Sequence, residues 1–305
     1  MAEKDITERL LTSHNDVFAD IANGCFTLLG GGRPFRRVEP EDLRDTRARS
    51  AYKAFGELRE QERDVAKLWA AGGAVICLLG LENQTAVDPN MPLRVFGYEG
   101  GDYRWQLTQK GLKPYPVLTL VLYFGVERRW PSERTLFARL NVDEALRPFL
   151  NDCRVNVLEV AWLTEKEAEV FTSDFRIVVN VLRQIRIYGT FSGTAQEIEH
   201  ADAMMKFLAG VTGDRAFEAA QTLIKKGERI TMMDVLSRMQ AKSRAEGRME
   251  GRMEGRMEGR DQLLFSLVGD GVLSPGAAAE RANMSEEEFR ARMREQETQN
   301  GQNGH

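Results

Sequence analysis

Residues 74–84, AVICLLGLENQ, form the longest apolar segment that ends in polar side chains, and the fold is best predicted from them. Residues 74–81 are apolar or glycine throughout, which is typical of a strand that is buried on both faces of a sheet. Glu82 and Gln84 follow directly, and the alternation of side chains along a strand puts both of them on the same face. The sequence therefore predicts a buried strand that ends with a carboxylate and an amide pointing in one direction.

Further strands and helices are predicted on either side of this strand. Runs of apolar residues predict strands over 64–69, 115–125 and 154–163. Apolar residues at helical spacing predict helices over 6–22, 91–107 and 174–188. Strands interleaved with helices indicate an α/β core.

The C-terminal third has a different pattern. From residue 195 the apolar spacing is helical only, and residues 246–260 repeat Glu-Gly-Arg-Met. Ser274 with Pro275, and Ser285 with Glu288, predict the starts of two short helices. We therefore expect an α/β domain over 1–190, a helical extension over 191–242, the repeat over 243–260, a small helical unit over 261–295 and a disordered tail over 296–305.

The repeat places equal charges four residues apart. On a helix, glutamates at this spacing face glutamates and arginines face arginines, and such pairs weakly destabilise the helix. Each glycine costs roughly 1 kcal/mol of helix stability relative to alanine. The segment is therefore expected to be a flexible linker or a marginal helix. A partner helix with opposite stripes of charge would stabilise it, and the repeat and the C-terminal helices would then hold a homo-oligomer together.

The composition is that of an ordinary folded chain. Of the 305 residues, 42% are hydrophobic and 29% are charged, which excludes a mainly disordered chain. The longest apolar runs have eight residues, whereas a membrane-spanning helix needs about 18, so no membrane segment is expected. Residues 1–8 are charged and do not resemble a secretory signal. The three cysteines are scattered in no disulfide or zinc pattern, so we expect a cytoplasmic protein.

Charge and sequence motifs make several functions improbable. The chain has 42 basic and 46 acidic residues, a net charge of −4, so DNA binding would require a local basic surface. The three histidines, His14, His200 and His305, do not predict a histidine-rich metal site. No G-x-S-x-G motif occurs, and this disfavours a hydrolase with a nucleophilic serine or cysteine.

Two carboxylates could carry chemistry at the end of the central strand. Asp64 belongs to the preceding short strand, and a hairpin turn at Gly72-Gly73 would bring it towards Glu82. Together with the backbone carbonyl of Asn83, they would form a site of hard oxygen ligands, which suits Mg²⁺. In the alternative reading, Glu82 is a solvated rim residue or an ion-pair partner of Lys67 or Arg94.

Several motifs in this region resemble the Rpn family of recombination-promoting nucleases, also named YhgA-like transposases, within the PD-(D/E)XK nuclease superfamily. The resemblance covers about residues 10–190. It rests there on five motifs, which are Arg63-Asp64-Val65, Gly80-Leu81-Glu82-Asn83-Gln84, Met91-Pro92-Leu93-Arg94, residues 116–125 and Arg154-Val155-Asn156-Val157. The short charged glycine repeats near the C-terminus are a sixth similar feature, and the tail matches loosely.

The resemblance implies a restriction-endonuclease-like core, a mixed central sheet flanked by helices, and Mg²⁺-dependent cleavage of DNA. Asp64 and Glu82 match the metal-binding acids of the family. Gln84 falls where the wider superfamily places a lysine. A glutamine amide can form hydrogen bonds but cannot supply the charge of an ammonium group, so a cation such as Lys67 could take that role.

Asp20, in the first predicted helix, corresponds to an additional acid found in parts of the superfamily. In the alternative reading, it is a solvated residue of an amphipathic helix.

Basic and aromatic residues follow the central strand and could contact phosphates and support DNA. In the alternative reading, they form an ordinary surface of arginines lying over partly buried aromatic rings. The set is Arg94, Tyr98, Tyr103, Arg104, Trp105, Lys110, Lys113, Arg128, Arg129 and Trp130.

The sequence therefore favours a DNA endonuclease in which Asp64, Glu82 and Gln84 are catalytic and in which Asp64, Glu82 and the Asn83 carbonyl hold Mg²⁺. Its cleavage of DNA would promote recombination. Two alternatives stay open. One is a degenerate nuclease fold that binds nucleic acid or regulates its own family. The other is an association protein that depends on residues 241–305.

Overall fold

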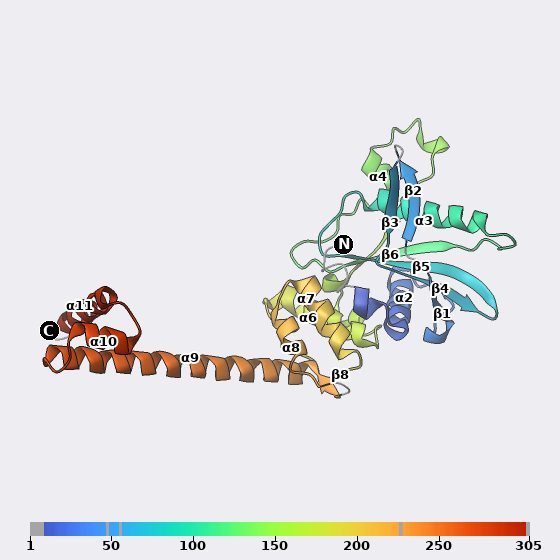
Figure 1. The fold of residues 1–305 in the computed structure, drawn as a ribbon. Helices are drawn as coiled ribbons and strands as arrows, with labels where there is room; N and C mark the ends of the chain where they lie inside the picture. The colour runs from blue at the N-terminus through green and yellow to red at the C-terminus, as the bar shows by residue number, and fades with distance from the viewer. Residues whose placement is uncertain (1–8, 47–48, 55–56, 226–227, 303–305) are drawn as a thin grey trace. The chain divides into compact units, whose positions relative to one another are not determined.

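The computed structural model describes residues 9–46, 49–54, 57–225 and 228–302 (Figure 1). The chain separates into two compact units, Met1–Met239 and Gln240–His305. The first unit contains the α/β core that the sequence predicts. The second unit is helical.

A five-stranded mixed sheet forms the centre of the first unit. Its strands lie in the order β1 (Leu43–Asp45), β4 (Val65–Ala71), β5 (Ala74–Gln84), β6 (Val117–Tyr123) and β7 (Asn156–Glu159). β1, β4 and β5 are antiparallel neighbours, whereas β5, β6 and β7 run parallel. The strand predicted over 154–163 is shorter than expected, because the chain turns into a 3-10 helix, η3, at Val160–Trp162.

The hairpin between β4 and β5 sets the register of the sheet. Gly72 and Gly73 form its turn with φ values of +62° and +81°, which glycine adopts without strain. Val65 pairs with Leu81 across the two strands. Asp64 precedes Val65 and Glu82 follows Leu81, so the hairpin brings the two acids to the same level of the sheet.

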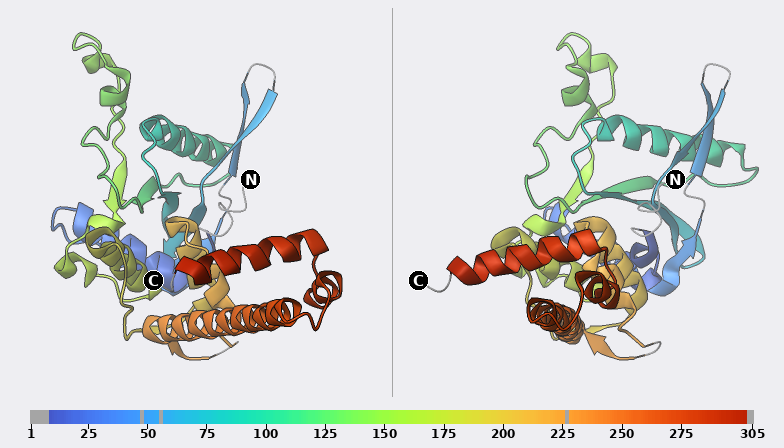
Figure 2. Two further views of the ribbon diagram at one scale, coloured as in Figure 1. Left: turned by 90° about the vertical axis from the view of Figure 1, so that its left-hand side faces the viewer. Right: turned by 60° about the vertical axis from the view of Figure 1, so that its left-hand side comes forward.

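Helices cover both faces of this sheet. α2 (Asn15–Leu29) and α6 (Asp174–Tyr188) lie on one side, and α3 (Met91–Thr108) lies on the other (Figure 1). Figure 2 shows the same separation from two further directions. Leu79 and Leu81 of β5 belong to the core under α2 and α6. Because side chains alternate along a strand, Glu82 points to the opposite face, towards α3.

The first helix differs from the prediction. Residues 9–12 are helical, and a separate helix, α2, begins at Asn15 and continues to Leu29; residues 6–8 lie outside the described chain. Gly24 lies inside α2, beyond the predicted end of the helix at residue 22. A Cβ at Gly24 would lie 2.1 Å from Cε1 of Phe171. The glycine is therefore explained by close packing of α2 against Phe171.

The charged stretch over 39–63 contains a 3-10 helix and three strands. A short 3-10 helix, η1 (Pro40–Asp42), leads into β1. β2 (Arg49–Ala54) and β3 (Glu57–Glu62) then form an antiparallel hairpin. Figure 1 shows this hairpin rising beside α3.

Three short helical elements lie in the connections that follow β6. They are α4 (Leu136–Leu140), the 3-10 helix η2 (Arg147–Phe149) and α5 (Glu165–Ala168). Thr164 caps α5, and Thr164 and Glu167 form a reciprocal capping box.

Helices α7 (Ala201–Thr212) and α8 (Ala216–Gln221) belong to the same hydrophobic core as the sheet. Phe207 of α7 contacts Phe124 edge to face, with ring centroids 5.3 Å apart. The sequence predicts only helices in this part, but β8 (Glu197–Ile198) pairs with β9 (Ile230–Thr231) as a short two-stranded sheet.

The second unit contains two short helices and most of a long one. α9 (Met232–Gly269) runs through the whole Glu-Gly-Arg-Met repeat, and α10 (Pro275–Ala282) and α11 (Glu286–Gln302) follow. Phe289 packs with Leu264 and with alanines of α10. Residues 296–302, expected to be disordered, continue α11, and 303–305 lie outside the described chain. None of the described helices is long and apolar enough to cross a membrane.

Candidate functional site

Asp64 lies between β3 and β4, beside the end of β5. Its Oδ2 accepts a hydrogen bond of 2.6 Å from the backbone N–H of Asn83. This bond fixes Asp64 against the residue that follows Glu82. The two acids therefore meet at one edge of the sheet, as the predicted hairpin requires.

Glu82 is buried, with 2% of its surface exposed. Its Oε1 accepts hydrogen bonds from the guanidinium of Arg94, on α3, and from Nε2 of Gln84 at 3.3 Å. Gln84 thus lies on the same face as Glu82, as strand alternation predicts. The glutamine amide directly orients the carboxylate.

The second oxygen of Glu82, Oε2, is buried and has no hydrogen-bond partner among the described residues. An unpaired buried oxygen is costly unless it gains a proton or a cation. Burial, reinforced by nearby Asp64, raises the pKa of Glu82 to about 8, although Arg94, Arg63 and Arg9 oppose the shift. A buried carboxylate with an unpaired oxygen, beside a second carboxylate, fits a divalent cation.

The carbonyl of Asn83 lies at the same edge. In an extended strand the N–H and C=O of one residue point to the same neighbouring strand. The Asn83 N–H points to Asp64, and β4 pairs with β5 only as far as Leu81. The carbonyl therefore faces the edge where Asp64 lies. Two carboxylates and one carbonyl form a set of hard oxygen donors that suits Mg²⁺.

Two arginines contact the acids. Arg94 pairs with Glu82 and also with Asp88, at 2.9 Å. Arg9 lies with its Nε 3.3 Å from Oδ1 of Asp64. Arg94, rather than Lys67, is therefore the basic residue that contacts Glu82.

Lys67 is not the replacement for the missing lysine. It belongs to β4, but its Nζ pairs with Oδ1 of Asp45 at 2.5 Å and lies 5.8 Å from the ring centroid of Phe18, a residue of α2. Its side chain thus points to the α2 face, away from Glu82. Among the residues described here, the cation at Glu82 is Arg94, because α3 packs over that face of the sheet.

A buried ion pair lies next to the acids, and the sequence analysis did not predict it. Arg63, immediately before Asp64, pairs with Asp102 of α3 at 2.5 Å. A Cβ at Gly80 would lie 2.6 Å from Cδ of Arg63, so the glycine leaves room for the arginine. The only sequence signal was a glycine within an otherwise apolar strand.

Asp20 has a different environment from either expectation. It is 5% exposed, so it is not a solvated residue. Its carboxylate accepts hydrogen bonds from the backbone and hydroxyl groups of Thr172 and Ser173, with the shortest at 2.7 Å. Ser173 is the N-cap of α6. Asp20 therefore anchors the start of α6 rather than joining Asp64 and Glu82.

The basic and aromatic residues divide into two groups. Tyr98 and Trp130 are buried, and their rings are not available for stacking. Tyr103 and Trp105 of α3 are 43% and 44% exposed, and Arg104 between them is exposed. Tyr103, Arg104 and Trp105 are therefore the part of the predicted DNA surface that combines exposed rings with a positive charge, although the Tyr103 hydroxyl also accepts a hydrogen bond of 3.1 Å from the N–H of Val117, at the start of β6.

The comparisons with known proteins agree with the predicted family. The family model described as "Putative transposase, YhgA-like" matches residues 56–209, about half of the chain. The chain therefore belongs to this family, and the resemblance to YhgA-like transposases found in the sequence is confirmed. The matched region contains Asp64, Glu82, Gln84 and Arg94. No curated protein and no solved structure matches the chain.

Proposed function

We propose that this protein is a Mg²⁺-dependent DNA endonuclease that hydrolyses phosphodiester bonds. One observation carries the proposal: Asp64 and Glu82 meet at a strand end, and Glu82 has a buried oxygen without a partner among the described residues. Membership of the YhgA-like family supports a role in nuclease or transposition chemistry. A mixed sheet with helices on both faces supports a restriction-endonuclease-like core.

Asp64, Glu82 and the Asn83 carbonyl would hold the metal in this proposal. A bound Mg²⁺ would acidify water and neutralise charge on the phosphodiester. The chain itself orients the ligands. The Asn83 N–H fixes Asp64, and the Gln84 amide fixes Glu82.

Gln84 and Arg94 would share the role of the superfamily lysine. Gln84 has a second amide N–H that can donate to water or to a phosphate oxygen, but it carries no charge. Arg94 brings a permanent positive charge to the same carboxylate. Arg94 would therefore stabilise negative charge on the phosphate as it develops.

DNA would lie along the outer side of α3. Arg104 would contact phosphates, and Tyr103 and Trp105 would stack on exposed bases or sugars. The resulting nicks or double-strand breaks would promote recombination in the cytoplasm, where the three free cysteines would stay reduced.

Nicking of supercoiled plasmid tests this function. Purified protein should nick DNA with Mg²⁺ and not with EDTA. Asp64→Ala and Glu82→Ala should abolish nicking, because each removes a metal ligand, while the circular dichroism spectrum stays that of a folded chain. Nicking that survives both substitutions would overturn the assignment.

A degenerate nuclease fold is the second candidate. The contacts of Arg94 with Glu82 and of Arg9 with Asp64 favour it, because arginines then balance the charges that a metal would balance. In that case the protein binds DNA but does not cleave it, and it shows no Mg²⁺ binding by calorimetry. In such a protein neither the wild type nor Arg94→Ala would cleave DNA.

A further inference from the structure

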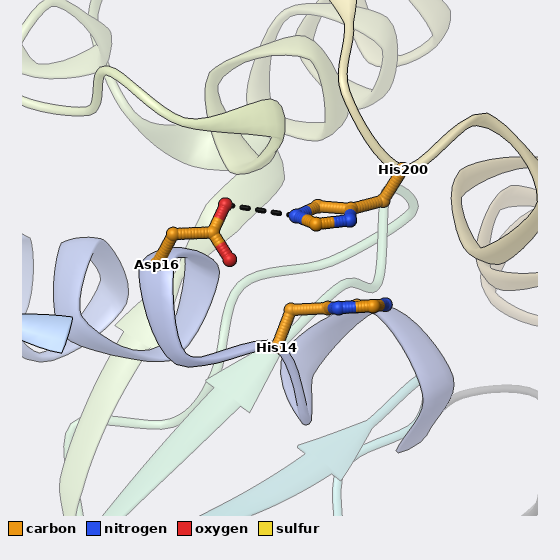
Figure 3. A group of neighbouring side chains, drawn as sticks. All are labelled: His14, Asp16 and His200. Atoms are coloured by element: carbon orange, nitrogen blue, oxygen red, sulfur yellow. Dashed lines mark hydrogen bonds and ion pairs between the residues drawn. The ribbon is translucent and has the colours of Figure 1, made fainter. Parts of the chain in front are cut away.

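A second polar cluster joins segments that are far apart in the sequence. His14 and Asp16 lie at the start of α2, and His200 lies directly before α7 (Figure 3). The two imidazole rings are stacked, with centroids 3.7 Å apart and planes inclined by 17°. Nε2 of His200 lies 2.9 Å from Oδ2 of Asp16. One ligand atom from each of the three residues lies within 4.8 Å of the other two.

The backbone holds both histidines in place. The His200 N–H donates to Oδ2 of Asp174 at 2.7 Å, and Asp174 is 3% exposed. The His14 carbonyl accepts a hydrogen bond of 2.8 Å from the N–H of Phe18. Fixed backbones of this kind reduce the conformational freedom that is lost when side chains gather around a ligand.

The donor set points to a particular class of ligand. Two imidazole nitrogens and one carboxylate oxygen are ligands that zinc and related transition metals accept, whereas Mg²⁺ prefers oxygen alone. Three protein ligands leave at least one coordination position for water. We propose that His14, Asp16 and His200 bind one divalent transition metal ion, with Zn²⁺ as the representative.

Binding requires one local rearrangement. A metal lies close to the plane of the imidazole that binds it, and the two rings here are nearly parallel. One ring must therefore turn about its side-chain bonds so that both nitrogens point to one ion. The bound metal would then connect α2 to the start of α7, which are close in space although the residues that form the contact are 184 positions apart.

This site is separate from the proposed Mg²⁺ site. It shares no residue with Asp64, Glu82 and Asn83, and it has nitrogen ligands. An excess of Mg²⁺ can therefore occupy the site of Asp64, Glu82 and Asn83 while Zn²⁺ is added to the site of His14, Asp16 and His200.

The test is a Zn²⁺ titration of the full-length chain after treatment with EDTA, in buffer with excess Mg²⁺. We expect one Zn²⁺ per chain. His14→Phe keeps an aromatic ring against His200 but removes a ligand. It should weaken Zn²⁺ binding by more than about 100-fold, because losing a residue that only supports a metal ligand costs up to about 100-fold in affinity. His200→Ala should do the same. His305→Ala, which changes the remaining histidine of the sequence, should bind like the parent.

Two further measurements keep the test decisive. Zn²⁺ should raise the melting temperature of the parent and of His305→Ala, but not that of His14→Phe, whose circular dichroism spectrum should stay that of a folded chain. Co²⁺ substituted for Zn²⁺ should show no thiolate-to-metal absorption, because none of the cysteines is a ligand. A parent that binds no Zn²⁺, binding unchanged in His14→Phe, or a thiolate band would overturn the proposal and leave the cluster as a ring stack with one hydrogen bond.

Discussion

Replacement of Glu82 by glutamine should stabilise the metal-free protein, although it removes a proposed metal ligand. Burial raises the pKa of Glu82 from 4.5 to about 8. Between these values the folded chain holds a proton that the unfolded chain has lost, so the stability of the wild type falls as the pH rises. Glutamine resembles the protonated acid and does not titrate, so the variant avoids this loss.

The size of the effect follows from the two pKa values. The stabilisation of Glu82→Gln relative to the wild type should be about 1 kcal/mol at pH 5, roughly 3 kcal/mol at pH 7 and roughly 4 kcal/mol at pH 8. These values are upper limits, since the folded chain can relax around an ionised carboxylate.

Urea unfolding in EDTA, followed by tryptophan fluorescence between pH 5 and pH 8, measures this difference. All four tryptophans belong to the first unit, so the signal reports on the unit that contains Glu82. Glu133→Gln changes an exposed carboxylate and serves as the control. Parallel pH profiles for wild type and Glu82→Gln, or a less stable variant at pH 8, would show that Glu82 is ionised in the fold and would refute the reasoning.

Three other predictions concern contacts away from Glu82. Asp20→Ala should lower the free energy of unfolding by about 2–3 kcal/mol, because it removes a buried charged acceptor of hydrogen bonds from the backbone and hydroxyl groups at the start of α6; a loss below about 1 kcal/mol in urea unfolding would contradict this. Gly24→Ala should destabilise by about 1–3 kcal/mol despite the better helix propensity of alanine, because its Cβ meets Phe171; an equal or higher midpoint would contradict it. The glutamates of the repeat and its arginines at 248, 252 and 256 are exposed on α9. We propose that two copies of the chain pair their opposite stripes, and that changing Glu250, Glu254 and Glu258 to arginine yields a monomer; analytical ultracentrifugation would contradict this if the wild type were already monomeric.

The parts of the fold that the sequence predicted depend on local patterns. The apolar run of β5, the glycine turn before it and the alternation beyond it are properties of neighbouring residues. They were enough to place Glu82 and Gln84 on one face and to bring Asp64 to the same level. The hairpin over β2 and β3 was missed, because its charged residues lack a clear strand pattern.

The parts that could not be predicted depend on contacts between distant residues. Asp20 meets Thr172, 152 positions away, and Asp16 meets His200, 184 positions away. Arg94 replaces Lys67 as the cation at Glu82 because α3 packs over that face, whereas Lys67 points to the other. The spacing of residues in one sequence does not predict these contacts, because they depend on how the helices pack against the sheet.

In the proposed function, Asp64 and Glu82 support DNA cleavage by holding a metal. The most direct measurement compares the single-turnover nicking rates of the wild type, Glu82→Gln and Glu99→Gln over a range of Mg²⁺ concentrations. Glu99 is a matched control, since it is a partly buried carboxylate on α3. It accepts a hydrogen bond from the N–H of Thr119 and is not one of the proposed metal ligands. We predict Mg²⁺-dependent nicking in the wild type and in Glu99→Gln, and none in Glu82→Gln. Equal nicking by all three proteins, or no nicking by the wild type at any Mg²⁺ concentration, would contradict the claim.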